Sequence, residues 1–206
     1  LRIIKVRSNL MHTCTLENPG KMAAILGLDS QRVEEICKHA SSIGTVVLAN
    51  YNSPTQSVIS GDEKAVNDTI DLLKADGAKR AILLNVSGAF HSPLMKNAGD
   101  GLRSYLNSIQ HGTIDTPIYM NSTAKQLLIE NLYDDMEKQI QSSVYFKQTI
   151  EHMIEDGITH FIEVGPGKVL SSLIKKINMD VQVSNLDKID DLDQLKGWLE
   201  ENGFKK

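Results

Sequence analysis

Residues Asn85–Met95 read NVSGAFHSPLM and mark the point where an extended segment passes into a helix. The preceding run, Arg80–Val86, is apolar and of strand length. Apolar residues then recur at helical spacing, at Leu94, Ala98, Leu102, Tyr105 and Ile109. Ser92 is a good N-cap, and Pro93 suits the first helical position, where its missing N–H has no cost. We therefore expect a strand-to-helix joint with His91 just outside the helix N-terminus.

The position of His91 predicts its charge. A helix N-terminus carries a partial positive charge that disfavours an imidazolium. The ring should therefore stay neutral near pH 7 and be able to accept a proton. From this stretch alone, a capped helix with a half-buried structural histidine is the preferred interpretation. The choice between the two interpretations depends on the rest of the chain.

Length and composition exclude several classes of protein. The 206 residues are 41% hydrophobic, which suffices for one large domain or two small ones. A net charge of −4 and only 5% aromatic residues provide no basic, stacking surface, so we expect no nucleic-acid partner. No apolar run approaches membrane-spanning length and no signal-peptide pattern opens the chain. We expect a cytoplasmic protein that does not contact membranes.

Cysteine and histidine spacing gives no metal site. Cys14 and Cys37 belong to no CxxC pair, and free thiols are the default in a reducing compartment. The six histidines form no cluster with the spacing of metal ligands. We therefore expect no bound metal.

Two units follow from the order of the predicted elements. Residues 17–86 alternate in the order β-α-β-β-α-β, with strands at 22–26, 45–49, 56–60 and 80–86. Asp29 or Ser30 should cap the first helix and Asp62 the second, and Tyr51–Pro54 reads as a polar loop. This order is typical of a ferredoxin-like small subdomain.

The larger unit would comprise residues 1–16 and 87–206. After Ser92, longer helices alternate with single short strands at 117–121, 160–164 and 181–184, which favours a parallel α/β layer. A polar stretch, 134–143, reads as a surface helix. The fold class is therefore α/β, with the small subdomain inserted into the larger one.

Two local motifs have competing interpretations. The glycines of Gly165–Lys168 are compatible with a phosphate-binding loop. That loop needs a glycine at position 162, which is Ile162, and a serine or threonine at position 169, which is Val169. A tight strand-to-helix turn is therefore the better interpretation. Apolar residues from Leu1 to Cys14 follow helical spacing and predict a helix at the start of the sequence. Arg7, near Ile4 and Met11 of this helix, is either a surface residue whose stem packs on apolar neighbours or a bidentate ligand for a carboxylate. No Gly-x-Ser-x-Gly nucleophile motif occurs in these residues.

Four ordered motifs resemble the malonyl-CoA:acyl carrier protein transacylase family. They are VRSNLM at 6–11, NYNSPTQSVISG at 50–61, VSGAFHSPLM at 86–95 and EVGPGKVL at 163–170. The resemblance runs to about residue 180. It implies an α/β-hydrolase-like large domain, here incomplete, with an inserted ferredoxin-like subdomain.

The resemblance also implies an activity and its residues. The family transfers malonyl from malonyl-CoA, through an acyl-serine, to the phosphopantetheine thiol of acyl carrier protein, with no permanently bound cofactor. His91 would be the general base and Arg7 the clamp for the free malonyl carboxylate. Gln139 matches the position whose main-chain carbonyl orients the histidine. Phe90 and Met11 would line the substrate site, where the ring of Phe90 leaves no room for an α-methyl group.

One part of the family pattern has no counterpart here. The N-terminal Gly-Gln-Gly loop and Gly-His-Ser-x-Gly elbow are not among these residues. We expect a C-terminal portion of the enzyme that is inactive alone and that pairs with the missing portion or self-associates. The alternatives are a non-catalytic module that binds acyl carrier protein or CoA, and a discrete acyltransferase of a polyketide synthase.

Overall fold

The computed structural model describes residues 1–42 and 44–204. The chain divides into two compact units, residues 1–149 and 150–206, which are described separately. Among the described residues, none of the helices combines the length and apolar character needed to cross a membrane.

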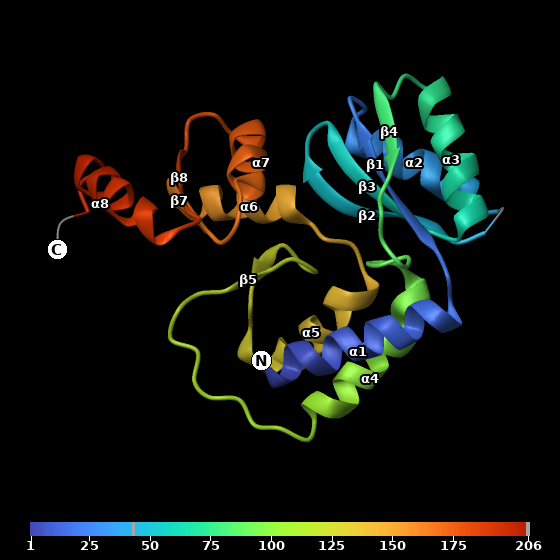
Figure 1. Ribbon diagram of the computed structural model, residues 1–206, viewed down its shortest axis with the longest axis horizontal. Coiled ribbons are helices and arrows are strands. Elements are labelled where there is room, and N and C mark those ends of the chain that lie inside the picture. Colours follow the sequence, from blue (N-terminus) through green and yellow to red (C-terminus); the bar gives the residue numbers. More distant parts are fainter. Residues whose placement is uncertain (43, 205–206) are drawn as a thin grey trace. The chain divides into compact units, whose positions relative to one another are not determined.

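A four-stranded antiparallel sheet forms the upper part of the first unit (Figure 1). Its strands are β1 (Lys21–Leu26), β2 (Val46–Ser53), β3 (Gln56–Gly61) and β4 (Arg80–Leu83), in the order β2-β3-β1-β4. Helices α2 (Ser30–Ala40) and α3 (Glu63–Ala75) pack against it around a core that includes Ile25, Val33, Ile59 and Leu73. Apolar residues at helical spacing on α2 and α3 therefore meet alternating apolar residues of the strands.

The caps of these helices explain where they begin. The carboxylate of Asp29 accepts the Gln31 N–H at 2.8 Å, which satisfies one of the free donors of α2. Asp62 precedes α3, but its carboxylate accepts the N–H of Thr45 at 2.7 Å instead of a helical N–H. Asp62 therefore ties the start of α3 to the start of β2.

Two predicted element boundaries in this sheet are wrong. The expected loop at Tyr51–Pro54 is mostly strand, since β2 continues to Ser53 and pairs with Gln56 across a tight turn. Backbone pairing thus overrides the polar composition of the segment. The expected strand at 80–86 ends at Leu83, beyond which the Leu84 N–H still bonds to the Met22 carbonyl at 2.9 Å.

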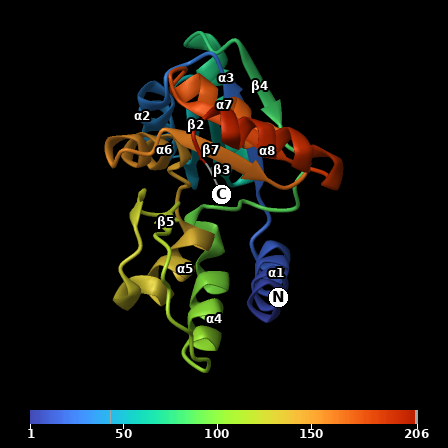
Figure 2. The ribbon, with the colours of Figure 1, turned by 90° about the vertical axis from the view of Figure 1, so that its left-hand side faces the viewer.

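A helical layer completes the first unit. Its members are α1 (Arg2–Glu17), a 3₁₀ turn (η1, Pro93–Met95) that leads into α4 (Lys96–Leu106), and α5 (Leu132–Gln141). Figures 1 and 2 both show α1, α4 and α5 gathered on one side of the four-stranded sheet. They enclose a second core of Cys14, Met95, Ala98, Leu102, Leu106 and Ile140. Because Ile140 is fully buried there, α5 is a packed helix on one face and not simply the surface helix predicted.

The segment after α5 adds to the edge of the sheet. Val144 forms a parallel bridge to Asn50, with its N–H bonded to the Ala49 carbonyl at 2.7 Å and its carbonyl accepting the Tyr51 N–H at 2.9 Å. The rings of Tyr51 and Tyr145 stack with centroids 5.1 Å apart. The end of α5 is thereby fixed to β2.

The strand predicted at 117–121 is much shorter than expected. Only β5 (Tyr119–Met120) forms, and it pairs antiparallel with β6 (Lys125–Gln126), which was not predicted. A further 3₁₀ turn, η2 (Ile129–Asn131), precedes α5. The expected parallel layer is therefore wrong for this segment, because the described residues offer β5 no strand other than β6 to pair with.

The second unit is built on a parallel pair of strands, as predicted. Strand β7 (His160–Val164) pairs in register with β8 (Gln182–Leu186), and α7 (Val169–Ile177) connects them. A 3₁₀ turn, η3 (Ile189–Asp191), and α8 (Leu192–Glu201) follow, while α6 (Phe146–Glu155) spans the boundary between the units.

The glycine-rich turn between β7 and α7 is a tight turn, as the sequence indicated. Gly165 and Gly167 have φ of 139° and 88°, conformations that favour glycine. The N–H groups at the start of α7 donate to the Glu163 carboxylate and not to a ligand: Leu170 at 3.1 Å and Ser171 at 2.7 Å. Burial alone would raise the pKa of Glu163, but these bonds and the Ser171 hydroxyl outweigh it and lower the pKa.

Candidate functional site

The backbone at His91 adopts an uncommon conformation, which Ala124 is the other non-glycine residue to share among the described residues. His91 has φ of 57°, in the left-handed region that few residues other than glycine occupy. Such a conformation costs on the order of 1–3 kcal/mol and persists only where surrounding contacts enforce it. Ser92, the next residue, is extended, with φ of −131° and ψ of 166°, as the proline after it requires.

The C-terminus of α5 supplies those contacts. The Nδ1 atom of His91 lies 2.8 Å from the main-chain oxygen of Gln139, and the His91 N–H donates to the Ile140 carbonyl at 3.2 Å. The last carbonyls of a helix have no partner within it. His91 therefore satisfies two of them, one with its ring and one with its backbone.

These contacts determine the tautomer of the ring. A carbonyl oxygen can only accept a hydrogen bond, so Nδ1 carries the proton and Nε2 is left with a free lone pair. A neutral histidine in this state can accept a proton at Nε2. An acidic side chain is not needed to orient the ring, because the Gln139 carbonyl performs that task.

Burial lowers the pKa of His91 below its ordinary value. The Gln139 carbonyl opposes this shift, the positive charge of Arg7 adds to it, and the Ser142 backbone opposes it more weakly. The neutral ring predicted from the sequence is thus supported, but the predicted cause, the partial positive charge of the helix N-terminus, is incomplete. Burial, and not the helix N-terminus, is the largest cause.

Arg7 is half-buried on α1 and has no counter-ion in the part of the chain that the structure describes. Burial lowers the pKa of its guanidinium, and among the described residues no carboxylate pairs with it. By contrast, Arg103 of α4 pairs with Asp134 and Glu137. An unpaired, partly desolvated guanidinium favours a carboxylate ligand.

The two apolar candidates pack against the hydrophobic cores. Met11 and Phe90 are half-buried and pack against the core shared by α1, α4 and α5, and Phe90 also contacts a smaller cluster of Met22, Ala49 and Val58. Phe90 thus bridges the helical layer and the sheet at the residue before His91. The structure brings Arg7, His91 and Gln139 into one site and places Met11 and Phe90 in the packing beside it.

Sequence reasoning missed the main-chain contributors. The carbonyls of Ile140 and Ser142 act on His91, yet a carbonyl group is present at every residue and leaves no signal in the sequence. The left-handed backbone of His91 was also unexpected. Only the capping pattern around Ser92 indicated that this turn is ordered.

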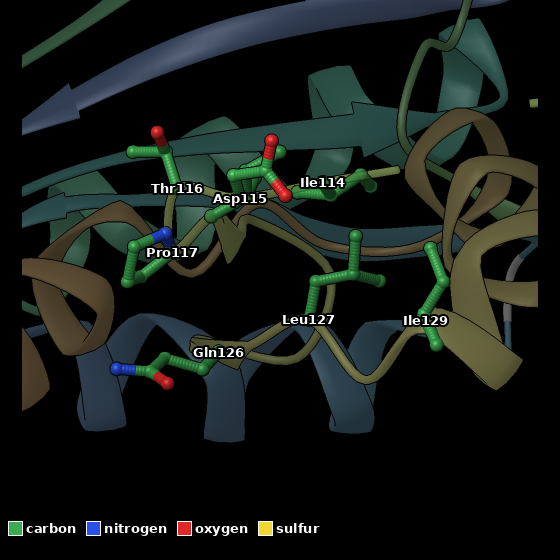
Figure 3. Close-up of a pocket in the computed structure, with 8 residues that line it drawn as sticks. Ile114, Asp115, Thr116, Pro117, Gln126, Leu127 and Ile129 are labelled. Atoms are coloured by element: carbon green, nitrogen blue, oxygen red, sulfur yellow. The ribbon is translucent and has the colours of Figure 1, made fainter. Parts of the chain in front are cut away.

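A separate pocket of about 240 Å³ is lined by the segments on either side of the β5–β6 hairpin (Figure 3). Leu127 and Ile129 point toward the same side, whereas Gln126 extends away from them. Asp115 is the one titratable side chain in its lining. The lining contains no histidine, cysteine or serine, so we do not assign the chemistry of His91 to this pocket.

No group of three or more histidine, cysteine or acidic side chains in residues 1–42 and 44–204 is placed to hold a metal ion. The arrangement therefore consists of a neutral base, an orienting carbonyl and an unpaired cation. Together these groups can accept a proton next to a bound carboxylate.

Known proteins share both the sequence and the fold. The family model described as "Acyl transferase domain" matches residues 1–187. Malonyl CoA-acyl carrier protein transacylase of Staphylococcus aureus (strain MRSA252) is 41% identical over 202 residues, which is 97% of this chain and 65% of the relative. The chain thus spans slightly less than two thirds of that relative's length.

Solved structures agree with this match. The malonyl CoA-acyl carrier protein transacylase of Clostridium perfringens ATCC 13124 superposes with a TM-score of 0.92 at 35% identity, covering 98% of this chain and 64% of that one. A type II PKS acyl-carrier protein in complex with its malonyl-transacylase gives a TM-score of 0.90 at 33% identity, covering 95% and 64%. These neighbours establish an α/β fold for the chain.

Proposed function

The chain belongs to the acyl transferase domain family, and from that premise we propose that it serves the transfer of malonyl from malonyl-CoA to the phosphopantetheine thiol of acyl carrier protein. The observation that carries the proposal is the neutral, oriented His91 beside the unpaired Arg7. In this proposal residues 1–16 and 87–206 belong to an incomplete α/β-hydrolase-like domain. Residues 17–86 are its inserted ferredoxin-like subdomain, an assignment supported by their β2-β3-β1-β4 strand order.

His91 is the general base in both halves of the reaction. Its Nε2 atom takes the proton of a serine hydroxyl as the new C–O bond forms, and the C–S bond of the thioester breaks. The imidazolium then returns the proton to the departing CoA thiolate. In the second half, Nε2 deprotonates the phosphopantetheine thiol, which takes the malonyl group, and the proton goes back to the serine oxygen. The Gln139 carbonyl keeps Nε2 directed toward these oxygen and sulfur atoms and stabilises the imidazolium.

Arg7 selects the acyl group. Malonyl differs from acetyl by one free carboxylate, and a planar guanidinium binds a carboxylate through two parallel hydrogen bonds. Because Arg7 lacks a protein partner among the described residues, it is available for this carboxylate. Phe90 and Met11 complete the substrate site in this proposal, with Phe90 excluding an α-methyl group through its size.

The serine nucleophile lies outside these 206 residues in this proposal, since they contain no Gly-x-Ser-x-Gly motif. The chain by itself would then bind but not react, and the missing portion would be its partner.

The reaction needs no cofactor beyond malonyl-CoA and the carrier protein, and we propose that it takes place in the cytoplasm. The absent motif equally favours the second candidate, a non-catalytic module that binds acyl carrier protein or CoA. A carrier of polyketide synthesis is the alternative acceptor, as in the complex among the structural neighbours.

The experiment compares two proteins. One is the chain alone, and the other is the joined protein, in which the part of the Staphylococcus aureus relative that this chain does not cover precedes Leu1. We expect malonyl-CoA to add one malonyl group to the joined protein, detected by mass spectrometry, and none to the chain alone. Covalent malonylation of the chain alone would overturn the assignment of the nucleophile. A joined protein that folds and binds malonyl-CoA without becoming labelled would favour the binding module.

A further inference from the structure

The Ser92 hydroxyl makes two hydrogen bonds, one of which spans His91. Its side chain is fully buried, and its hydroxyl donates to the Ala89 carbonyl at 2.6 Å. The same oxygen accepts the N–H of Leu94 at 3.3 Å. The first bond reaches back across Phe90 and His91, and the second reaches forward across Pro93. One hydroxyl thus closes the turn that contains His91 and also fixes the first residues that follow Ser92.

Helix capping does not account for this arrangement. An N-cap side chain needs only to accept a hydrogen bond from one of the first helical N–H groups. In Ser92 that bond is the longer of the two, whereas the shorter one is donated backward to Ala89, away from the helix. The Ala89 carbonyl is itself in a fully buried residue, so loss of the hydroxyl would leave a polar group without a partner.

The strained backbone of His91 requires such a closure. With φ of 57°, His91 would relax to a negative φ if its flanks were released. That rotation would carry Nδ1 away from the Gln139 carbonyl and the N–H away from Ile140. Both of those bonds are made to α5, while Ser92 provides the restraint from the segment of chain that carries His91.

We propose that Ser92 is a positioning residue, whose hydroxyl holds His91 in the left-handed conformation that directs Nε2 toward the reacting atoms. This inference rests on the proposed function, which it deepens by assigning the restraint on the base. Ser92 does not contact the substrate in this role. It acts through the backbone of His91.

The experiment uses the full 206-residue chain and needs no substrate. We would record ¹⁵N signals of the His91 ring and hydrogen exchange of its N–H in the wild type, Ser92→Ala and Ser92→Cys. In the wild type, Nδ1 should be the protonated nitrogen. In Ser92→Ala we expect both tautomers, a pKa of His91 that rises toward the ordinary value as the ring becomes exposed, and N–H exchange at least about tenfold faster.

A matched control separates positioning from general stability. Thr69 is also fully buried and its hydroxyl donates to one carbonyl, that of Ala65, at 2.6 Å within α3. Thr69→Ala should leave the His91 ring signals unchanged. Ser92→Cys, which keeps a weak donor of similar size, should restore the wild-type tautomer in part.

The proposal is overturned if Ser92→Ala keeps the single tautomer and slow exchange of the wild type, or if Thr69→Ala alters the His91 signals equally. If Ser92→Ala does not fold, Ser92→Cys decides the question. Its weaker donor should give a His91 N–H exchange rate between that of the wild type and that of an unrestrained N–H. A His91 N–H exchange rate in Ser92→Cys equal to that of the wild type would then refute the role of the hydroxyl. Failure of the malonyl-transfer proposal would not change these signals, because they are measured without substrate.

Discussion

Arg7 offers the sharpest test of substrate selection. We consider Arg7→Met, which removes the charge and keeps an unbranched side chain suited to the interior of α1. A hydrogen bond to a charged group is worth about 1.5–3 kcal/mol, and two such bonds to one carboxylate are less than additive, so the loss of the grip on the malonyl carboxylate should cost about 2–4 kcal/mol. Because each 1.4 kcal/mol is tenfold, the preference for malonyl-CoA over acetyl-CoA should fall roughly 30-fold to 700-fold.

The same change should not damage the fold. Arg7 is half-buried without a carboxylate partner among the described residues, so its removal relieves a desolvated charge. We expect the free energy of unfolding to stay within about 0.5 kcal/mol of wild type or to rise. The pKa of His91 should also rise, since the charge of Arg7 contributes to its lowering.

The assay is the ratio of kcat/KM for malonyl-CoA to that for acetyl-CoA in the joined protein, with urea denaturation of the chain alone in parallel. Lys5→Met is the control, because Lys5 is an exposed cation on the same helix. It should change neither quantity. An unchanged preference in Arg7→Met together with a loss of stability would show that Arg7 is a structural residue and would refute the clamp.

Three further predictions concern the folded chain. His91 has a pKa near 6.5 in the unfolded state and a lower pKa in the folded state, so the unfolded state binds the proton first and stability should fall as the pH drops below about 6.5. In urea titrations between about pH 5 and 7.5, His91→Gln should reduce this dependence of stability on pH. An equal dependence in the wild type and in His91→Gln would exclude the effect. A Cβ at Gly88 would lie 2.2 Å from the Thr15 Cγ2, so Gly88→Ala should lower the free energy of unfolding by about 1–3 kcal/mol. A Cβ at Gly112 meets nothing within 4 Å, so Gly112→Ala should stay within about 0.5 kcal/mol of the wild type. A larger loss in Gly112→Ala than in Gly88→Ala, measured by denaturation, would contradict this packing. Burial, aided by the charge of Glu34, raises the pKa of Cys37 to about 12. Iodoacetamide at about pH 8 should therefore leave Cys37 unmodified in the native chain and alkylate it in denaturant, as measured by mass spectrometry. Alkylation of the native chain would show that the thiol is accessible.

Hydrophobic periodicity predicted most elements of this fold. The helices α2 and α3 begin directly after Asp29 and Asp62, where their caps were predicted, and the strands β1, β3 and β7 lie within a few residues of the expected ranges. The errors fall where long-range pairing determines the structure. Strand β2 extends through Tyr51 and Ser53 because the hairpin and Val144 pair with it, and the local composition of that segment indicates only a loop.

The candidate site was predictable in its side chains but not in its backbone. Two of the four motifs contain Arg7 and His91, and the family resemblance implied the role of Gln139; the structure places the Gln139 carbonyl against the His91 ring. The left-handed conformation of His91 and the Ile140 carbonyl that receives its N–H arise from the meeting of two segments about 50 residues apart. Neither follows from local propensity, since a non-glycine residue with positive φ is held by its surroundings and not by its own preference.

His91 is the proposed base for malonyl transfer. This role is tested most directly by single-turnover transfer from malonyl-CoA to phosphopantetheinylated acyl carrier protein, measured in the joined protein with His91 or with His91→Ala. General acid–base catalysis contributes roughly 10²–10⁴-fold. We expect the transfer rate to fall by at least about a hundredfold in His91→Ala while malonyl-CoA still binds. A rate within about fivefold of the unsubstituted protein would contradict the assignment of His91 as the base.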